Sequence, residues 1–149
     1  MLDNEITIHS PKLGEVRYKE DDLITLTTPL LGFAELSDYL IISNSDYFPF
    51  LWLQSVEDPS VCFILIEPKP FFEGYAPNIN KRELKVLGVP DVSGLKTFCI
   101  VVIPEDPQMA TANLRAPFVV NFERKIAKQI VLDDDKYSIR SRLFPSEER

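Results

Sequence analysis

The sequence predicts an all-β fold: a single-domain, small antiparallel β-barrel of several short strands with one short helix. Twelve prolines are spread along the 149 residues. Because proline interrupts helix interiors and central strands, the regular elements between the prolines must be short. The runs between these breakers are rich in Val, Ile, Phe and Tyr, which favour strands. Short strands at such spacing are typical of a sandwich or a small closed barrel, and closure removes the sheet edges that promote aggregation.

Ten runs of this kind are predicted to be strands. In chain order they are residues 5–8, 15–18, 23–26, 39–43, 50–55, 61–66, 97–103, 118–122, 126–132 and 137–142. In the run 50–55 both alternating sides are largely apolar, which is typical of a strand that is covered on both faces.

One short helix of about two turns is predicted between the sixth and seventh of these strands. Asn80 is placed as its N-cap, Glu83 occupies the capping-box position, and Gly88 provides a C-terminal stop. Leu84 and Leu87 are spaced to share one helix face, so we expect them to pack on the sheet.

The length fits one domain that folds without disulfides or a structural metal. We expect this domain to span residues 1–144 and residues 145–149 to form a frayed polar tail. Cys62 and Cys99 each lie inside an apolar run, which predicts reduced, buried side chains. No stretch approaches the ~20 apolar residues of a membrane span, and the N-terminus lacks the basic region of a signal peptide, so a cytoplasmic protein without membrane association is expected.

The net charge of −7 is distributed unevenly. Residues 1–67 hold 12 acidic and 3 basic side chains, a net charge of −9, whereas residues 68–149 hold 11 acidic and 13 basic side chains, a net charge of +2. Direct binding of nucleic acid requires clustered cations and is therefore disfavoured. An acidic face would instead steer a basic protein partner, although the same carboxylates could simply solvate the surface.

The acidic residues and the single histidine do not form a pattern typical of a catalytic or metal site. Asp133, Asp134 and Asp135 form the densest acidic cluster, but they lack the spacing of a calcium loop and indicate a polar turn. His9, the single histidine, follows a strand and is expected to be an ordinary surface residue. The sequence thus predicts a protein that is not an enzyme and holds no metal and no cofactor.

A surface that recognises another protein is the best site hypothesis. Pro104 and Pro107 impose an extended exit from the strand ending at Ile103, and a second loop carries aromatic residues after two prolines. Thr111 and Asn113 could bond a partner's backbone, or could satisfy their own loop. The predicted partner-binding residues are Phe71, Phe72, Tyr75, Ile103, Pro104, Pro107, Thr111, Asn113, Leu114, Arg115 and Pro117.

Several motifs, in this order, resemble the FliW family of bacterial flagellar assembly factors. They are the segments 29–33 (PLLGF), 49–55 (PFLWLQS), 71–72 with Tyr75, 102–107 (VIPEDP), 111–114 (TANL), 116–117, Asn121 and 128–132 (KQIVL). Two residues depart from the family pattern. Arg115 stands where an aliphatic residue is usual, and Ala127 stands where a turn glycine is common.

The resemblance implies a barrel-like protein without enzymatic activity that is a monomer when free. It implies two protein partners: newly made flagellin, bound in a chaperone-like manner, and the translational regulator CsrA, bound when flagellin is scarce. In the family, CsrA bound in this way releases flagellin mRNA for translation. The acidic charge agrees with a basic RNA-binding partner.

Two other classes of function remain open at this stage. A small-molecule-binding barrel would hold an apolar ligand in its interior, and it predicts a sizeable apolar cavity where a protein-binding module predicts a filled interior. An enzyme with paired carboxylates would place acidic side chains opposite each other in a cleft, with perturbed pKa values.

Overall fold

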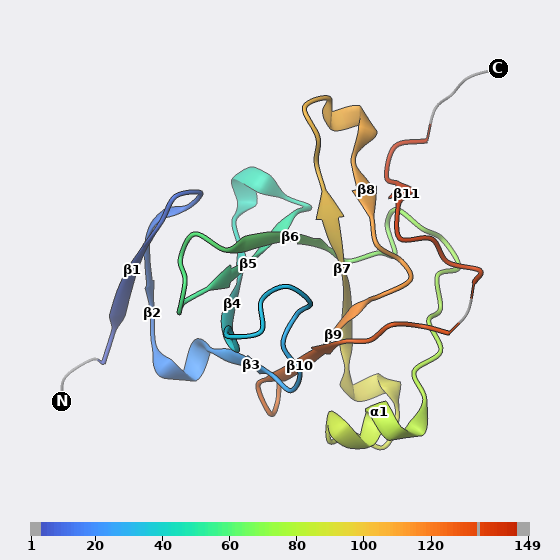
Figure 1. Ribbon diagram of the computed structural model, residues 1–149, viewed down its shortest axis with the longest axis horizontal. Helices are drawn as coiled ribbons and strands as arrows, with labels where there is room; N and C mark the ends of the chain where they lie inside the picture. The colour runs from blue at the N-terminus through green and yellow to red at the C-terminus, as the bar shows by residue number, and fades with distance from the viewer. Residues whose placement is uncertain (1–3, 134, 146–149) are drawn as a thin grey trace.

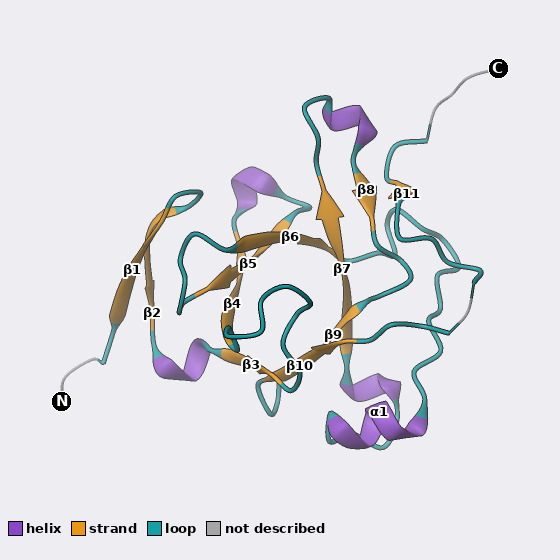
Figure 2. Cartoon of the chain, viewed as in Figure 1, coloured by secondary structure: helices purple, strands orange, loops and turns teal. Residues whose placement is uncertain are grey.

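Seven strands close into a barrel in the computed structural model, which describes residues 4–133 and 135–145 (Figures 1 and 2). The barrel strands are β3 (Ile24–Leu26), β4 (Asp38–Ser43), β5 (Leu51–Ser55), β6 (Cys62–Ile66), β7 (Lys96–Val102), β9 (Phe118–Asn121) and β10 (Ile126–Gln129). Pairing of β7 with β9 closes the ring. Neighbouring strands are antiparallel except β3 and β10, which are parallel. The predicted fold class, a small all-β barrel with one short helix, is confirmed.

Four short strands lie outside the ring. The hairpin of β1 (Ile6–Ser10) and β2 (Gly14–Tyr18) stands beside the barrel, and β8 (Thr111–Ala112) with β11 (Ser141–Arg142) extends the sheet from β7 (Figure 1). The connections hold four 3-10 turns: η1 (Glu20–Asp22), η2 (Ser45–Tyr47), η3 (Val92–Gly94) and η4 (Pro107–Met109).

The barrel interior is filled by side chains. Its buried core consists of Ile24, Leu26, Leu30, Tyr39, Leu53, Leu65, Phe98, Phe118, Val120 and Ala127. Tyr39, Leu53, Leu65 and Phe118 have no solvent exposure at all. A packed interior is the feature that distinguishes a protein-binding module from a barrel that encloses a ligand.

Strand β7 changes its partner along one edge. Lys96–Phe98 pairs with β9 inside the ring, and Val101–Val102 pairs with β8 outside it, while the other edge of β7 pairs with β6. The chain passes from β8 to β9 through residues 113–117, where Asn113 N donates to the Ile100 carbonyl at 2.9 Å. One strand therefore supports both the barrel and the projecting β7–β8 hairpin.

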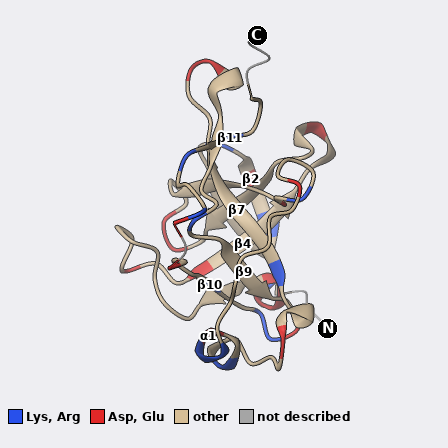
Figure 3. Ribbon diagram, turned by 90° about the vertical axis from the view of Figure 1, so that its right-hand side faces the viewer, with Lys and Arg blue, Asp and Glu red and all other residues tan. Residues whose placement is uncertain are grey.

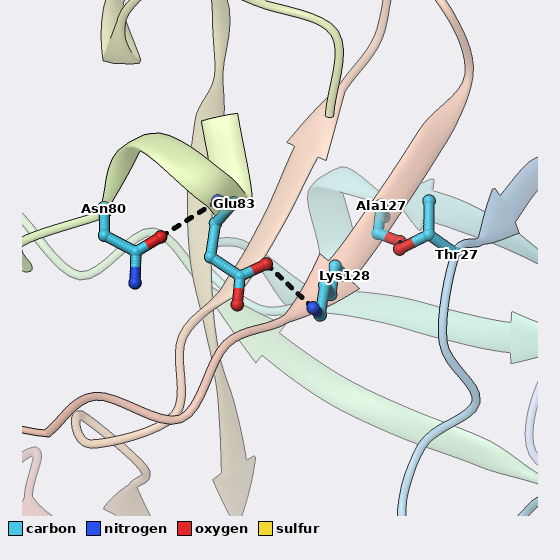
Figure 4. A network of polar contacts seen from close by, with 5 residues as sticks. All are labelled: Thr27, Asn80, Glu83, Ala127 and Lys128. Carbon is cyan, nitrogen blue, oxygen red and sulfur yellow. Dashed lines mark hydrogen bonds and ion pairs between the residues drawn. The ribbon is translucent and has the colours of Figure 1, made fainter. Parts of the chain in front are cut away.

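Helix α1 (Lys81–Val86) begins as predicted, since the Asn80 side chain accepts a hydrogen bond from Glu83 N at 2.9 Å. The Glu83 carboxylate does not return to the cap. It accepts from Lys128 Nζ of β10 at 2.7 Å, and both side chains are largely buried (Figure 4). Leu87 is fully buried against the barrel, and the Asn121 amide donates to the Leu87 carbonyl at 2.7 Å. The helix is thus fastened to the β9–β10 hairpin at both of its ends.

Eight of the ten predicted strands match an observed strand to within one or two residues at each end; β1 continues through His9 to Ser10, where the predicted run ended at residue 8. The other two predicted runs differ more. The run predicted at 126–132 ends as β10 at Gln129, and the run predicted at 137–142 is a strand only as β11. Ile130 N and Leu132 N still donate to the carbonyls of Pro117 and Arg115, but Pro117 has no N–H to return, so the ladder stops there. Strand β8 was not predicted, because two residues are too few for a pattern. The predicted polar tail lies, except for Pro145, outside the described residues.

The Glu83–Lys128 ion pair offers a test of how α1 is held. Glu83→Gln should lower the free energy of unfolding by about 1–3 kcal/mol, because the side chains are 14% and 21% exposed and the lysine would lose its partner. Glu67→Gln is the matched control, since the Glu67–Lys96 pair is half exposed and should contribute less than about 1 kcal/mol. Urea unfolding followed by circular dichroism measures both. Equal losses of unfolding free energy in the two variants would show that the Glu83–Lys128 ion pair does not hold helix α1 in place.

Candidate functional site

The β7–β8 hairpin extends beyond the ring of barrel strands (Figure 1). It carries exposed apolar side chains at its far end. We call residues 102–109 the hairpin tip. Val102 is 64% exposed, Met109 47% and Ile103 38%. The residues on either side of the tip, Val101 and Ala110, are buried. The chain therefore leaves the core after Val101 and returns to it at Ala110. Three large apolar side chains are thus exposed within the eight residues of the hairpin tip.

The hairpin tip is held in one conformation by local hydrogen bonds. The Asp106 carboxylate accepts from Gln108 N at 3.0 Å and caps η4, and Pro107 occupies the first turn of that element. The Arg142 guanidinium of β11 donates to the Gln108 carbonyl at 3.1 Å. A surface that is already ordered loses less conformational entropy on binding than a flexible loop does.

The charge of the tip is negative. Residues 102–109 contain Glu105 and Asp106 and no basic residue. Helix α1 carries Lys81, Arg82 and Lys85 at the other end of the molecule (Figure 3). The hairpin tip and helix α1 therefore differ in the sign of their own net charge.

Aromatic side chains hold the base of the hairpin against the rest of the chain. We call Phe71, Tyr75, Tyr137 and Phe144 the aromatic clamp. The Tyr75 hydroxyl donates to the Leu114 carbonyl at 2.7 Å, and its ring meets the Tyr137 ring edge-on with centroids 4.8 Å apart. The Tyr137 hydroxyl accepts from Ala76 N at 3.1 Å, and the Phe71 and Phe144 rings meet at 6.2 Å. These contacts join three segments that are distant in sequence.

The segment between β8 and β9 is tied to its own chain. The Asn113 side chain accepts from Arg115 N at 3.1 Å and from Ala116 N at 3.0 Å, which is the local role that the sequence left open. The Arg115 guanidinium pairs with the Asp135 carboxylate at 3.0 Å, and Pro117 is fully buried. This segment shapes the crossing from hairpin to barrel.

The predicted site residues thus fall into two groups. Ile103, Pro104 and Pro107 are exposed at the tip. Half-buried or buried beneath it are Phe71, Phe72, Tyr75, Thr111, Asn113, Leu114, Arg115 and Pro117. The predicted set did not include Val102, at the end of β7, or Met109, in η4, because burial at the ends of such elements has no periodic signal in the sequence. It also did not include Arg142, which contacts the tip from 34 residues further along the chain.

The two thiols are not disposed for nucleophilic chemistry. Burial raises the pKa of the Cys99 thiol to about 12. Cys62 is only half-buried, whereas both cysteines were expected to be buried, and this partial burial raises the pKa of its thiol to about 11. Both thiols are therefore protonated near neutral pH, and the thiolate is the reactive form.

The described residues contain neither a candidate metal site nor a membrane-spanning helix. In residues 4–133 and 135–145, no group of three or more His, Cys, Asp or Glu side chains is arranged to hold a metal ion. Asp133 and Asp135 are exposed and lie in a bend and a turn, and Asp134 lies outside the described residues. Over the same residues, no helix has the length and apolar character needed to cross a bilayer.

The fold is a small all-β barrel with a filled interior and a projecting hairpin that carries exposed apolar side chains. A model of the FliW protein family matches residues 7–143. The chain is 40% identical over 134 residues to the flagellar assembly factor FliW of Caldanaerobacter subterraneus, covering 89% of each protein, and 38% identical over 137 residues to that of Bdellovibrio bacteriovorus, covering 92% of this chain and 78% of the other. A crystal structure of the flagellar assembly factor FliW superposes with a TM-score of 0.90 at 28% identity, covering 96% of this chain and all of that one. The chain belongs to the FliW family.

Because Leu114 is buried, we expect its replacement to lower the stability of the fold, whether or not it affects binding. Leu114→Ala should lower the free energy of unfolding by about 2–5 kcal/mol, because the side chain is 6% exposed in the core cluster beneath the hairpin. Val131→Ala, at a side chain 72% exposed, should change it by less than about 0.5 kcal/mol. Thermal or urea unfolding measures both changes. A stable Leu114→Ala protein would show that this leucine is not a core residue.

Proposed function

We propose that this protein is a flagellar assembly factor that works by binding other proteins and not by catalysis. The observation that carries the proposal is the similarity over nearly the whole chain to proteins named flagellar assembly factor FliW. In the proposed cycle the protein binds newly made flagellin in a chaperone-like manner. When flagellin is scarce it binds the translational regulator CsrA instead, which frees flagellin mRNA for translation. Both partners meet it in the cytoplasm, and the free protein is a monomer.

We place flagellin on the hairpin tip, with Ile103, Pro104 and Pro107 in the contact and the deeper predicted residues supporting it. The apolar side chains of Val102, Ile103 and Met109 supply the surface that a partner would desolvate. Phe71, Tyr75, Leu114 and the rest of the predicted set act in this proposal by fixing the hairpin base, since their side chains are half-buried or buried.

We assign the approach of CsrA to the carboxylates in the first half of the chain. The three consecutive acidic residues of η1, Glu20, Asp21 and Asp22, are exposed. A basic RNA-binding protein would be attracted to this face, and the attraction acts mainly on the rate of encounter. Competition between two partners for one protein would then link flagellin synthesis to flagellin supply.

The flagellin contact is tested by a charge placed in the apolar patch. Ile103→Asp should weaken flagellin binding by at least about tenfold, because an unpaired carboxylate would have to lose its water in the interface. Val92→Asp is the control: Val92 is an exposed apolar residue, and the seven-residue strand β7, roughly 20 Å long, separates it from the tip. Calorimetric titration of flagellin into each folded variant measures the affinity. If both variants bind as the parent does, flagellin does not use the hairpin tip.

The CsrA contact is tested through its dependence on salt. The double variant Glu20→Gln, Asp21→Asn should slow association with CsrA about two- to fivefold at low ionic strength, and the difference should vanish as salt is added. Neutralising Glu123 and Asp133 in the second half removes the same charge and should change the rate less. Stopped-flow kinetics measures these rates. A rate that does not respond to salt in the parent protein would refute steering, while loss of binding itself would be a separate finding about partner identity.

A further inference from the structure

A cleft of about 540 Å³ separates the β1–β2 hairpin from the barrel wall. We call it the hairpin cleft. On one side it is lined by four consecutive residues of β2, Glu15 to Tyr18, and on the other by four consecutive residues of β4, Leu40 to Ser43. Side chains alternate across a strand, so a lining made of consecutive residues indicates that the edge of each strand faces the cleft. The cleft shares no lining residue with the hairpin tip.

The edge of β4 that faces the cleft is unpaired over its second half. Among the described residues, strand β3 pairs with Asp38 and Tyr39 only, and the chain that leads into β3 is the turn η1, which does not pair with β4. Val56, directly after β5, donates its backbone N–H to the Asp38 carbonyl. The backbone N–H and C=O groups of successive strand residues point to alternate edges, so those of the even-numbered residues of β4 point toward β5. Ile41 and Ser43, in the alternate register, therefore direct theirs toward the side that β3 has left.

Strand β2 also has an open edge. It pairs along its whole length with β1 and with no other strand of the described chain. An open strand edge offers a row of N–H and C=O groups to an added strand. The hairpin cleft thus lies between two edges of this kind, on β2 and on the second half of β4.

The chemistry of the cleft limits what it can hold. Tyr18, Leu40 and Trp52 contribute apolar surface to its lining. The charged lining residues are Glu15, Arg17, Asp22 and Lys125. Two carboxylates and two cations give no net charge, and Arg17 is already paired with Glu15 at 2.7 Å. Charge complementarity therefore favours an occupant with an uncharged central segment.

We propose that the hairpin cleft binds an extended, uncharged segment of another polypeptide that adds as a strand between β4 and β2. Main-chain hydrogen bonds to the two edges provide the affinity, and alternate apolar side chains of the segment pack on the Trp52 side of the cleft. An incompletely folded chain offers such segments, whereas a folded partner would have to present a protruding strand of its own. This site is separate from the hairpin tip, so it stands or falls independently of the flagellin contact proposed above.

The probes are capped synthetic peptides of about eight residues, the length of a typical strand, in which threonine alternates with valine, leucine or phenylalanine. Trp52 is the sole tryptophan of the chain and lines the cleft, so its fluorescence reports occupancy. We expect a saturable change with at least one peptide, and slower amide hydrogen exchange at Ile41 and Ser43 in the bound protein. The same peptide with N-methyl groups along one edge should bind at least about tenfold more weakly, because it lacks those donors.

The same hydrogen bonds can be tested by a substitution in the protein in place of a change in the peptide. Ser43→Pro removes the N–H that faces the cleft and leaves the β4–β5 ladder intact, so peptide affinity should fall at least about tenfold in a protein with an unchanged circular dichroism spectrum. Ser43→Ala keeps that N–H and should bind the peptide as the parent does.

Three results would overturn the proposal. One is the absence of saturable binding by all three peptides. Another is equal binding of the N-methylated and parent peptides, which would indicate an apolar groove without strand addition. The last is slow exchange of Ile41 and Ser43 in the free protein that depends on its concentration, which would show that a second copy already fills the cleft.

Discussion

The structure depends on the pairing of β7 with two different strands along one edge. Residues 96–98 pair with β9 and close the barrel, while Val101 and Val102 pair with β8 and support the projecting hairpin. Successive side chains of β7 serve two cores, since Phe98 packs inside the ring and Cys99 packs in the cluster under the hairpin. Because one strand performs both tasks, the orientation of the hairpin tip is fixed by the closure of the barrel.

The remaining contacts secure the places where the chain changes direction. The aromatic clamp holds the loop after β6 against the β8–β9 segment, and the Tyr75–Leu114 hydrogen bond lies at its centre. At the other end of the barrel, Glu83–Lys128 and Asn121–Leu87 hold helix α1 on the β9–β10 hairpin. Most polar side chains of the family motifs are used within the chain in this way. The apolar side chains of the hairpin tip are exposed, as are Leu31, Phe48 and Val131 elsewhere on the surface. In the proposed function the tip is the contact because it also projects from the barrel (Figure 1).

Local signals in the sequence were sufficient for the strand positions and for the helix, whose Asn80 cap and Leu87 contact were both predicted correctly. They were not sufficient for closure of the barrel, because the β7–β9 and β3–β10 pairings join residues far apart in sequence and one of them is parallel.

For the candidate site, the sequence identified the segments but not which of their side chains are exposed. Leu114 and Val102 are both apolar residues near turns, and only the tertiary structure shows that the first is 6% and the second 64% exposed. The hairpin cleft had no sequence signal, because an unpaired strand edge is a property of the sheet.

In the proposed function the protein is a surface for which other polypeptides compete, and its interior is already filled by its own side chains. Hydrogen–deuterium exchange of the protein, free and saturated with flagellin, tests this claim most directly. We expect slower exchange in residues 102–109 and unchanged exchange in η3 and α1, which lie at the far end of β7. Unchanged exchange at residues 102–109 together with protection at α1 would place the partner at the opposite end and contradict the account.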